Sequence, residues 1–162
     1  MTELWQLTAT EMVARLKARE VLPTEAVEAA FARIEQVEPQ IHALPTLCRE
    51  RALAAANRIE AGLGEDRRDD PTWLAGLPIA VKDLTEVAGV RTTFGSPIFA
   101  DHVPERSDIL VERLEANGAI VIGKSNTPEF GAGGNTFNAV FPSTVTPWNT
   151  SRSAAGSSGG SA

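Results

Sequence analysis

The chain has 162 residues and a mass of 17.2 kDa, which is enough for one domain with a sizeable core. Its composition, 43% hydrophobic and 22% charged, is that of an ordinary globular protein and excludes collagen-like, coiled-coil and disordered chains. The 15 basic residues are scattered and outnumbered by 21 acidic ones, so the formal charge is −6. Because phosphate contacts require the opposite balance, we expect no nucleic-acid binding.

The cysteine and histidine content limits the chemistry that is open to the chain. The only cysteine, Cys48, cannot form an intramolecular disulfide, and with only His42 and His102 it cannot complete a zinc site. The first six residues lack the features of a signal peptide, and no 18 consecutive residues are apolar. We therefore expect a cytoplasmic protein without a membrane span. Since the sequence has no tyrosine, catalysis should rely on serine, lysine and carboxylates.

Two amphipathic helices are predicted first along the chain. Thr8 and Glu11 have the spacing of a capping box, which predicts that a helix begins there. Pro23 separates this helix from the second, and Pro39 is predicted to end the second. The second helix has an apolar stripe of five residues: Val27, Ala30, Phe31, Ile34 and Val37.

A third amphipathic helix is predicted from Cys48 to Leu63, with Cys48 on its apolar side and therefore in the core. The following residues, 62–71, combine glycines, charges and a proline, which is typical of a solvated connection. We therefore predict an N-terminal helical segment, residues 1–72, followed by residues 73–162 of the same domain.

The second part of the chain has the pattern of an α/β protein. Residues 77–81 and 119–122 are short apolar runs with β-branched members, which predicts strands buried on both faces. A helix is predicted between them, with Ser107 as its N-cap and Asn117-Gly118 as its end. A strand, a helix and a strand in succession predict two parallel strands. The buried face of this helix is assigned to two leucines, Leu110 and Leu114.

Two lysines near these strands require opposite interpretations. Residues 118–125 match the P-loop pattern, but their middle is itself a predicted strand, so we reject nucleotide binding. Lys82 follows a predicted strand directly, at the position where open α/β sheets place functional groups. The alternative for Lys82 is a surface lysine paired with Asp83, although adjacent side chains of a strand point to opposite faces.

The last 32 residues, 131–162, are rich in glycine, serine, threonine and asparagine. Composition alone leaves open whether they form a surface loop with a flexible tail or a segment whose exposed backbone approaches a substrate.

Four ordered blocks, over roughly half of the chain, resemble the amino-terminal portion of amidase-signature enzymes. These blocks are residues 76–83 (GLPIAVKD), 123–130 (GKSNTPEF), 147–149 (PWN) and 156–162 (GSSGGSA). The resemblance implies an α/β/α fold with a mixed sheet, preceded by N-terminal helices. It also implies hydrolysis of a small-molecule carboxamide without a metal or an organic cofactor, and it is compatible with a homo-oligomer.

The resemblance also assigns residues to roles. Lys82 matches the family's catalytic lysine, and Ser157 matches the bridging serine, which lies beside a peptide bond of unusual geometry. Four neighbours of Ser157 are implied to support this turn: Gly156, Ser158, Gly159 and Gly160. The acyl-forming serine of the family belongs to a later Gly-Gly-Ser segment, so Ser161 is not assigned that role. We expect the nucleophile beyond Ala162 and interpret the chain as an amino-terminal portion.

The proposed chemistry needs a neutral lysine, because Lys82 must accept a proton from a serine hydroxyl. A carboxylate close to its amine would favour the charged form, so we predict that Asp83 points away from it. The chain departs from the family pattern at Ala154-Ala155, where Pro-Gly or Gly-Gly is usual, and at Pro142, where glycine is usual. An inactive fragment or pseudoenzyme is therefore one alternative, and another is the subunit of a transamidase that uses charged transfer RNA.

Aromatic residues offer less direct evidence on function. Aromatic side chains of an α/β domain usually belong to the core rather than to an acyl pocket, which is our prediction here. The residues concerned are Phe94, Phe99, Phe130, Phe137, Phe141 and Trp148. His102 is predicted to lie at the surface, in a loop.

Overall fold

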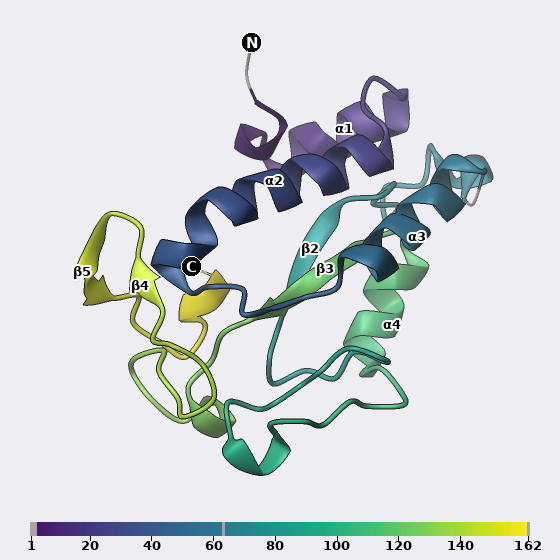
Figure 1. Cartoon of the computed structure of the whole chain (residues 1–162). Helices are drawn as coiled ribbons and strands as arrows, with labels where there is room; N and C mark the ends of the chain where they lie inside the picture. Colours follow the sequence, from purple (N-terminus) through teal and green to yellow (C-terminus); the bar gives the residue numbers. More distant parts are fainter. Residues whose placement is uncertain (1–2, 63, 162) are drawn as a thin grey trace. The chain divides into compact units, whose positions relative to one another are not determined.

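The computed structural model describes residues 3–62 and 64–161. Its α-helices are α1 (Ala9–Ala18), α2 (Pro23–Ile41), α3 (Arg49–Glu60) and α4 (Ile109–Ala116). Its strands are β1 (Thr46–Leu47), β2 (Pro78–Lys82), β3 (Ile120–Ser125), β4 (Val145–Thr146) and β5 (Asn149–Ser153) (Figure 1). The predicted position 63 at the end of the third helix lies outside the described residues.

The larger sheet has the order β1-β3-β2 and is mixed. β1 pairs antiparallel with β3, with Thr46 opposite Lys124. β2 and β3 run in the same direction, because Leu77 O accepts a hydrogen bond from Ile120 N at one end and Ser125 O accepts one from Asp83 N at the other. The predicted α/β class with a mixed sheet is therefore confirmed.

The chain divides into two compact units, each built from three stretches of sequence. Unit 1 comprises the chain up to Ile34 with Cys48–Ile79 and Glu112–Ile122. Unit 2 comprises Glu35–Leu47 and Ala80–Val111 with the chain from Gly123 onward. The division near residue 72 stays a prediction.

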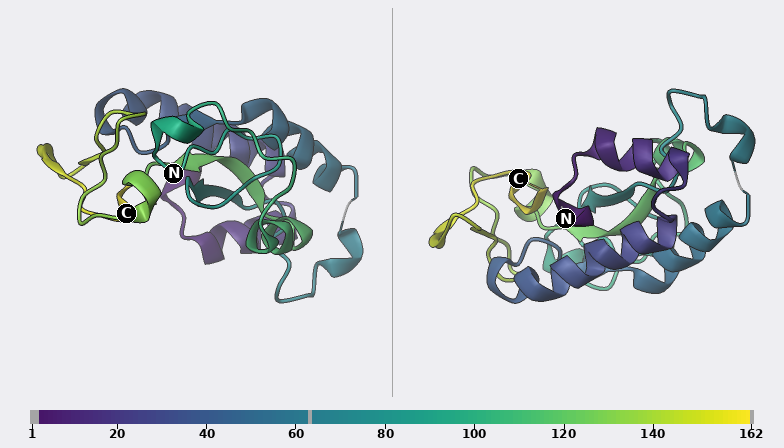
Figure 2. Two further views of the ribbon diagram at one scale, coloured as in Figure 1. Left: turned by 90° about the horizontal axis from the view of Figure 1, so that it is seen from below. Right: turned by 90° about the horizontal axis from the view of Figure 1, so that it is seen from above.

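Unit 1 holds an apolar core between its helices. The capping box of Thr8 and Glu11 is present, and α1 buries Met12 and Leu16 against Trp73. Figure 2 shows α1 and the end of α4 on one side of the paired strands, with α2 and α3 on the other side. Cys48 donates its thiol to Val121 O at 3.2 Å and so faces β3, but it is half-buried rather than part of the core as predicted.

The indole of Trp73 leaves no room for a side chain at two positions of unit 1, Gly64 and Gly118. A Cβ atom would lie 2.2 Å from the Trp73 ring at Gly64 and 2.8 Å from it at Gly118. Both glycines also have positive φ angles, 75° and 81°, which glycine adopts at no steric cost. Gly118 follows α4, so the predicted end of this helix at Asn117-Gly118 is confirmed.

Pro39 does not end the second helix, contrary to the prediction. α2 continues through Pro39 to Ile41. Pro39 donates no backbone hydrogen bond, and its ring conflicts with the carbonyl four residues earlier, so the last turn of α2 forms despite a local cost. The backbone beyond the helix is also satisfied locally, because the Glu38 carboxylate accepts hydrogen bonds from the N–H groups of Ala43 and Leu44.

The strands differ in burial from the prediction. All six residues of β3 are buried, as expected for the central strand. In β2, however, only Val81 is buried and Ala80 is exposed. β2 is an edge of the three-stranded order, so one of its sides has no strand beside it in the described part of the chain.

The buried face of α4 was also predicted wrongly. Leu110 is 62% exposed, and Val111 is the buried residue of this helix. The helix begins at Ile109, two residues after Ser107, whose hydroxyl accepts a hydrogen bond from Ala88 N instead of capping the helix. The leucine spacing fitted a helical face but did not determine which face meets the sheet.

Residues 131–161 are folded, so the interpretation as a flexible tail is wrong. β4 and β5 form an antiparallel hairpin, and a short 3-10 turn follows at Gly159–Ser161 (Figure 1). The buried Thr144 links this hairpin to the rest of unit 2 through its backbone, which bonds to Thr136 O and to Ala154 N.

Candidate active site

Lys82 is the last residue of β2, at the strand end where the sequence predicted it, and its amine contacts residues 155–161, called here the Gly-Ser segment. Lys82 Nζ donates to Ser157 Oγ at 2.8 Å and to Ser158 Oγ at 3.1 Å. Burial lowers the pKa of Lys82 below the ordinary value of a lysine. The two hydroxyls are neutral partners, so they do not oppose the loss of the proton as a carboxylate would.

The Gly-Ser segment is fastened by a buried threonine. Thr136 Oγ1 donates a hydrogen bond to Ala155 O at 2.8 Å and accepts one from Gly159 N at 3.0 Å. It therefore binds the backbone of the segment on both sides of Ser157. The peptide bond between Gly156 and Ser157 is cis, in agreement with the unusual geometry that the family resemblance implies.

Two glycines of the segment allow this close approach. A Cβ atom at Gly159 would lie 2.3 Å from Thr136 Oγ1, and one at Gly160 would lie 2.4 Å from Asn126 N. Gly156 is equally enclosed, because a Cβ there would lie 2.8 Å from Asn135 N. These glycines therefore leave no room for a side chain in the turn that holds Ser157. Their role in supporting the turn stays a prediction.

Asn126 connects the end of β3 to residues 138–144 and was missed from the sequence. Its side-chain amide donates to Thr144 Oγ1 and to Pro142 O, both at 3.0 Å. Its own Oδ1 accepts from Asn138 Nδ2 at 2.8 Å. An asparagine shortly after a predicted buried strand is the signal that could have indicated this role, and the structure shows that Asn126 is fully buried.

The departures from the family pattern have different consequences. Pro142 contributes through its carbonyl, which any residue supplies, so it removes no contact of Asn126. Ala155 has a φ angle of 60°, a left-handed conformation that costs about 1–2 kcal/mol for a residue with a Cβ atom. Ala154 keeps its backbone bond to Thr144 O. The strain is therefore confined to one residue beside Gly156.

Asp83 points away from the Lys82 amine, as predicted. Its carboxylate is fully buried and accepts hydrogen bonds from Thr93 N at 3.1 Å and from Thr93 Oγ1 at 2.5 Å. It also forms an ion pair with Lys124 at 3.2 Å. Lys124 lies within β3, so the segment that matches the P-loop pattern has no phosphate-binding loop.

The predicted core position of the aromatic residues is wrong. Trp148 is 94% exposed, and Phe94, Phe99 and Phe130 lie in loops and short turns, where they pack on one another with ring centroids 5.1 and 6.2 Å apart. No aromatic residue of this set is fully buried in the described ranges. His102 joins these rings and contacts Glu86 Oε1 at 2.9 Å, so it lies in a loop as expected but is half-buried.

Ser161 is hydrogen-bonded to Ser125 at the end of β3, with 2.6 Å between the hydroxyl oxygens.

Within residues 3–62 and 64–161, no group of three or more histidine, cysteine or acidic side chains could hold a metal ion. None of the helices in these ranges combines the length and the apolarity that crossing a bilayer requires.

Gly160 offers a test of how tightly the segment is held. We expect Gly160→Ala to lower the free energy of unfolding by about 1–3 kcal/mol, because the new Cβ would meet backbone atoms of Asn126 and Ala43 that cannot rotate away. Gly134→Ala is the matched control, since a Cβ at Gly134 meets nothing within 4 Å. Urea unfolding midpoints measure both, and equal midpoints would contradict the packing described.

The fold and the Lys82–Ser157 contact together define a class of α/β proteins with a serine–lysine site. The family model described as Amidase matches residues 25–162. The chain therefore belongs to the amidase family.

Relatives with known names match the chain over almost all of its length. The A subunit of glutamyl-tRNA(Gln) amidotransferase from Carboxydothermus hydrogenoformans is 42% identical over 160 residues, which are 99% of this chain and 33% of that protein. The corresponding protein of Chloroflexus aurantiacus is 43% identical over 162 residues, 100% of this chain and 33% of that protein. The chain thus spans about a third of the length of these curated relatives.

Solved structures agree with the fold. 6-Aminohexanoate cyclic dimer hydrolase in complex with substrate superposes with a TM-score of 0.85 at 31% identity, covering 99% of this chain and 31% of that one. A vestigial protein complex related to the origins of an s-triazine catabolic enzyme gives a TM-score of 0.86 at 35% identity, covering 96% and 34%.

Proposed function

We propose that this chain supplies the lysine and the bridging serine of an enzyme that cleaves carboxamide C–N bonds through an acyl-enzyme. The 2.8 Å contact between Lys82 Nζ and Ser157 Oγ carries this proposal. A neutral amine that is hydrogen-bonded to a serine hydroxyl can act as a general base, and the hydroxyl can pass a proton to it. The substrate is a small-molecule carboxamide, and the nucleophilic serine lies beyond Ala162.

Each proton of the proposed reaction has a defined route. The nucleophilic serine gives its proton to Ser157 Oγ as Ser157 gives its own to Lys82 Nζ, while the serine oxygen bonds to the substrate carbonyl carbon. The proton then returns along the same path to the leaving nitrogen as the C–N bond breaks. Water takes the place of the nucleophile in the second half, releases the carboxylic acid and restores the serine.

A transamidase subunit is the second candidate. The names of the relatives at 42% and 43% identity favour it, since both belong to a glutamyl-tRNA(Gln) amidotransferase. In such an enzyme the same amide cleavage supplies ammonia to a charged transfer RNA, with a partner subunit. Because this chain carries a charge of −6, contacts with the RNA phosphates would fall to other parts of the assembly. A cytoplasmic location and self-association stay predictions.

The proposal is tested in a fusion of residues 1–162 with the remaining two thirds of the Carboxydothermus hydrogenoformans protein. We expect the fusion to release ammonia from glutamine or a simple primary carboxamide at a rate within about tenfold of its parent, because 42% identity preserves the core that positions the site. A folded fusion without activity, beside an active parent, would contradict the proposal. Stimulation by charged transfer RNA and the partner subunits, with little turnover of other carboxamides, would favour the second candidate.

A further inference from the structure

Asp83, the residue that follows the proposed base in the sequence, forms a buried ion pair with Lys124 that has no part in the proton relay. Asp83 and Lys124 both have fully buried side chains. Lys124 Nζ contacts Asp83 Oδ1 at 3.2 Å, Thr92 Oγ1 at 2.7 Å and Thr85 O at 2.9 Å. All of these atoms belong to unit 2, as does Lys82.

Stability alone does not account for this pair. Removing two charges from water costs more free energy than their mutual attraction usually returns, and an apolar pair of similar size often replaces a buried ion pair without loss. The fold nevertheless provides Asp83 with a complete set of partners from two directions, Thr93 on one side and Lys124 of β3 on the other.

The position of Asp83 gives the pair a consequence for Lys82. The two residues are consecutive, so their charged groups lie roughly 10 Å apart on opposite faces of the strand end. Two unit charges at this separation in a protein interior interact strongly enough to move an ionisation by about one pH unit. A free carboxylate at Asp83 would therefore favour the charged form of Lys82, which cannot accept a proton.

We propose that Lys124 is a positioning residue of the site: it neutralises Asp83, so that no free negative charge close to Lys82 favours the charged form of its amine. This inference rests on the proposed function, in which Lys82 acts as the base. It also explains Lys124, the lysine of the rejected P-loop pattern: its ammonium group pairs with the carboxylate of Asp83 and not with a phosphate.

Two other carboxylates of unit 2 have partners of their own. Glu86 pairs with His102, and Glu129 accepts a hydrogen bond from Ser96. The Lys82 amine is met by the hydroxyls of the Gly-Ser segment, and burial is the cause of its lowered pKa. Substituting Asp83 or Lys124 would therefore change the net charge close to Lys82.

The chain has three lysines, Lys17, Lys82 and Lys124, so each ε-methylene signal can be followed by NMR as the pH is raised. We expect Lys124→Met to raise the pKa of Lys82 by about one unit and Asp83→Asn to lower it by a similar amount. The double variant, which buries neither charge, should return the pKa of Lys82 to near that of the unaltered chain. If the pair were merely structural, the two single substitutions would not shift the pKa of Lys82 in opposite directions.

The pKa of Lys82 staying unchanged in both single variants, or moving the same way in both, would overturn the inference. Dispersed methyl signals of Ile120 and Val121 report whether each variant is folded. If Lys124→Met does not fold, Asp83→Asn and the double variant still give the test, because only the former should lower the pKa of Lys82. The proposed function fails separately, if replacement of Lys82 leaves amide cleavage intact.

Discussion

Replacing Lys82 with methionine should lower kcat for amide cleavage in the fusion by about 10³–10⁴-fold, with little change in KM. Methionine keeps the length and the apolar stem of lysine but has no group that accepts a proton, so the general base is lost. Ser157 would also lose the partner that lies 2.8 Å from its hydroxyl. Initial rates of ammonia release from a primary carboxamide measure the effect.

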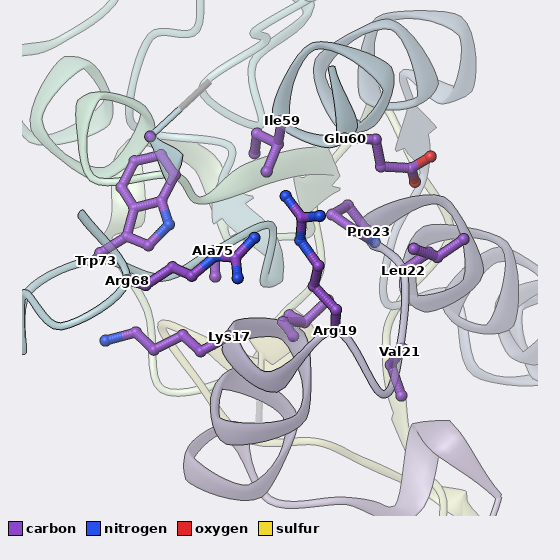
Figure 3. A pocket seen from close by; sticks show the side chains of 12 residues that line it. Lys17, Arg19, Val21, Leu22, Pro23, Ile59, Glu60, Arg68, Trp73 and Ala75 are labelled. Carbon is purple, nitrogen blue, oxygen red and sulfur yellow. The ribbon is translucent and has the colours of Figure 1, made fainter. Parts of the chain in front are cut away.

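Lys17 provides the matched control for this substitution. It belongs to α1, in a basic pocket of about 110 Å³ whose walls include Arg19, Arg68 and Trp73, and its amine donates to Asp70 O at 2.6 Å (Figure 3). Lys17→Met removes the same charge from unit 1 and should leave kcat within a few-fold of the unaltered fusion. Activity of Lys82→Met equal to that of this control would show that Lys82 is not the base.

Ser157→Ala is expected to lower kcat by about 10²–10⁴-fold, because the alanine cannot pass a proton from the nucleophile to Lys82. The main chain of the segment should remain in place, since Thr136 holds it through backbone groups of Ala155 and Gly159. Thermal unfolding should therefore change little. Ser151→Ala is the control, since Ser151 is an exposed serine whose hydroxyl bonds to Asn149 in the hairpin. A kcat equal to that of the control would remove Ser157 from the relay.

The sequence allowed the position of Lys82 to be predicted for a physical reason. Strands β2 and β3 are short apolar runs, and the polar residue after such a run lies at the strand end wherever the strand is placed. The role of Ser157, in contrast, came from family resemblance alone, because a Gly-Ser segment has the same composition as a linker.

Other features required the structure because they depend on contacts between distant residues. Helical periodicity identified α4 but not the rotation that buries Val111 and exposes Leu110. The grip of Thr136 on the Gly-Ser segment links residues 23 positions apart. The pair of Asp83 and Lys124 links residues 41 positions apart, and no local pattern marks either as a partner of the other.

The aromatic residues show the limit of composition rules most clearly. Burial statistics favour the core for phenylalanine and tryptophan, but these residues lie in loops and short turns rather than in α-helices or the larger sheet. Phe130 remains 54% exposed, and Trp148 occupies the connection between β4 and β5. The neighbourhood that a loop provides decides burial here, more than the hydrophobicity of the side chain.

The central claim, that Lys82 and Ser157 act as one relay, is tested most directly by combining the two substitutions in the fusion. Groups that act as a unit show strongly non-additive losses, because once one member is gone the other has nothing to pass on. We predict that kcat of the double variant, Lys82→Met with Ser157→Ala, lies within about threefold of the slower single variant. A double variant in which the two losses multiply would show that the residues act independently and would contradict the account.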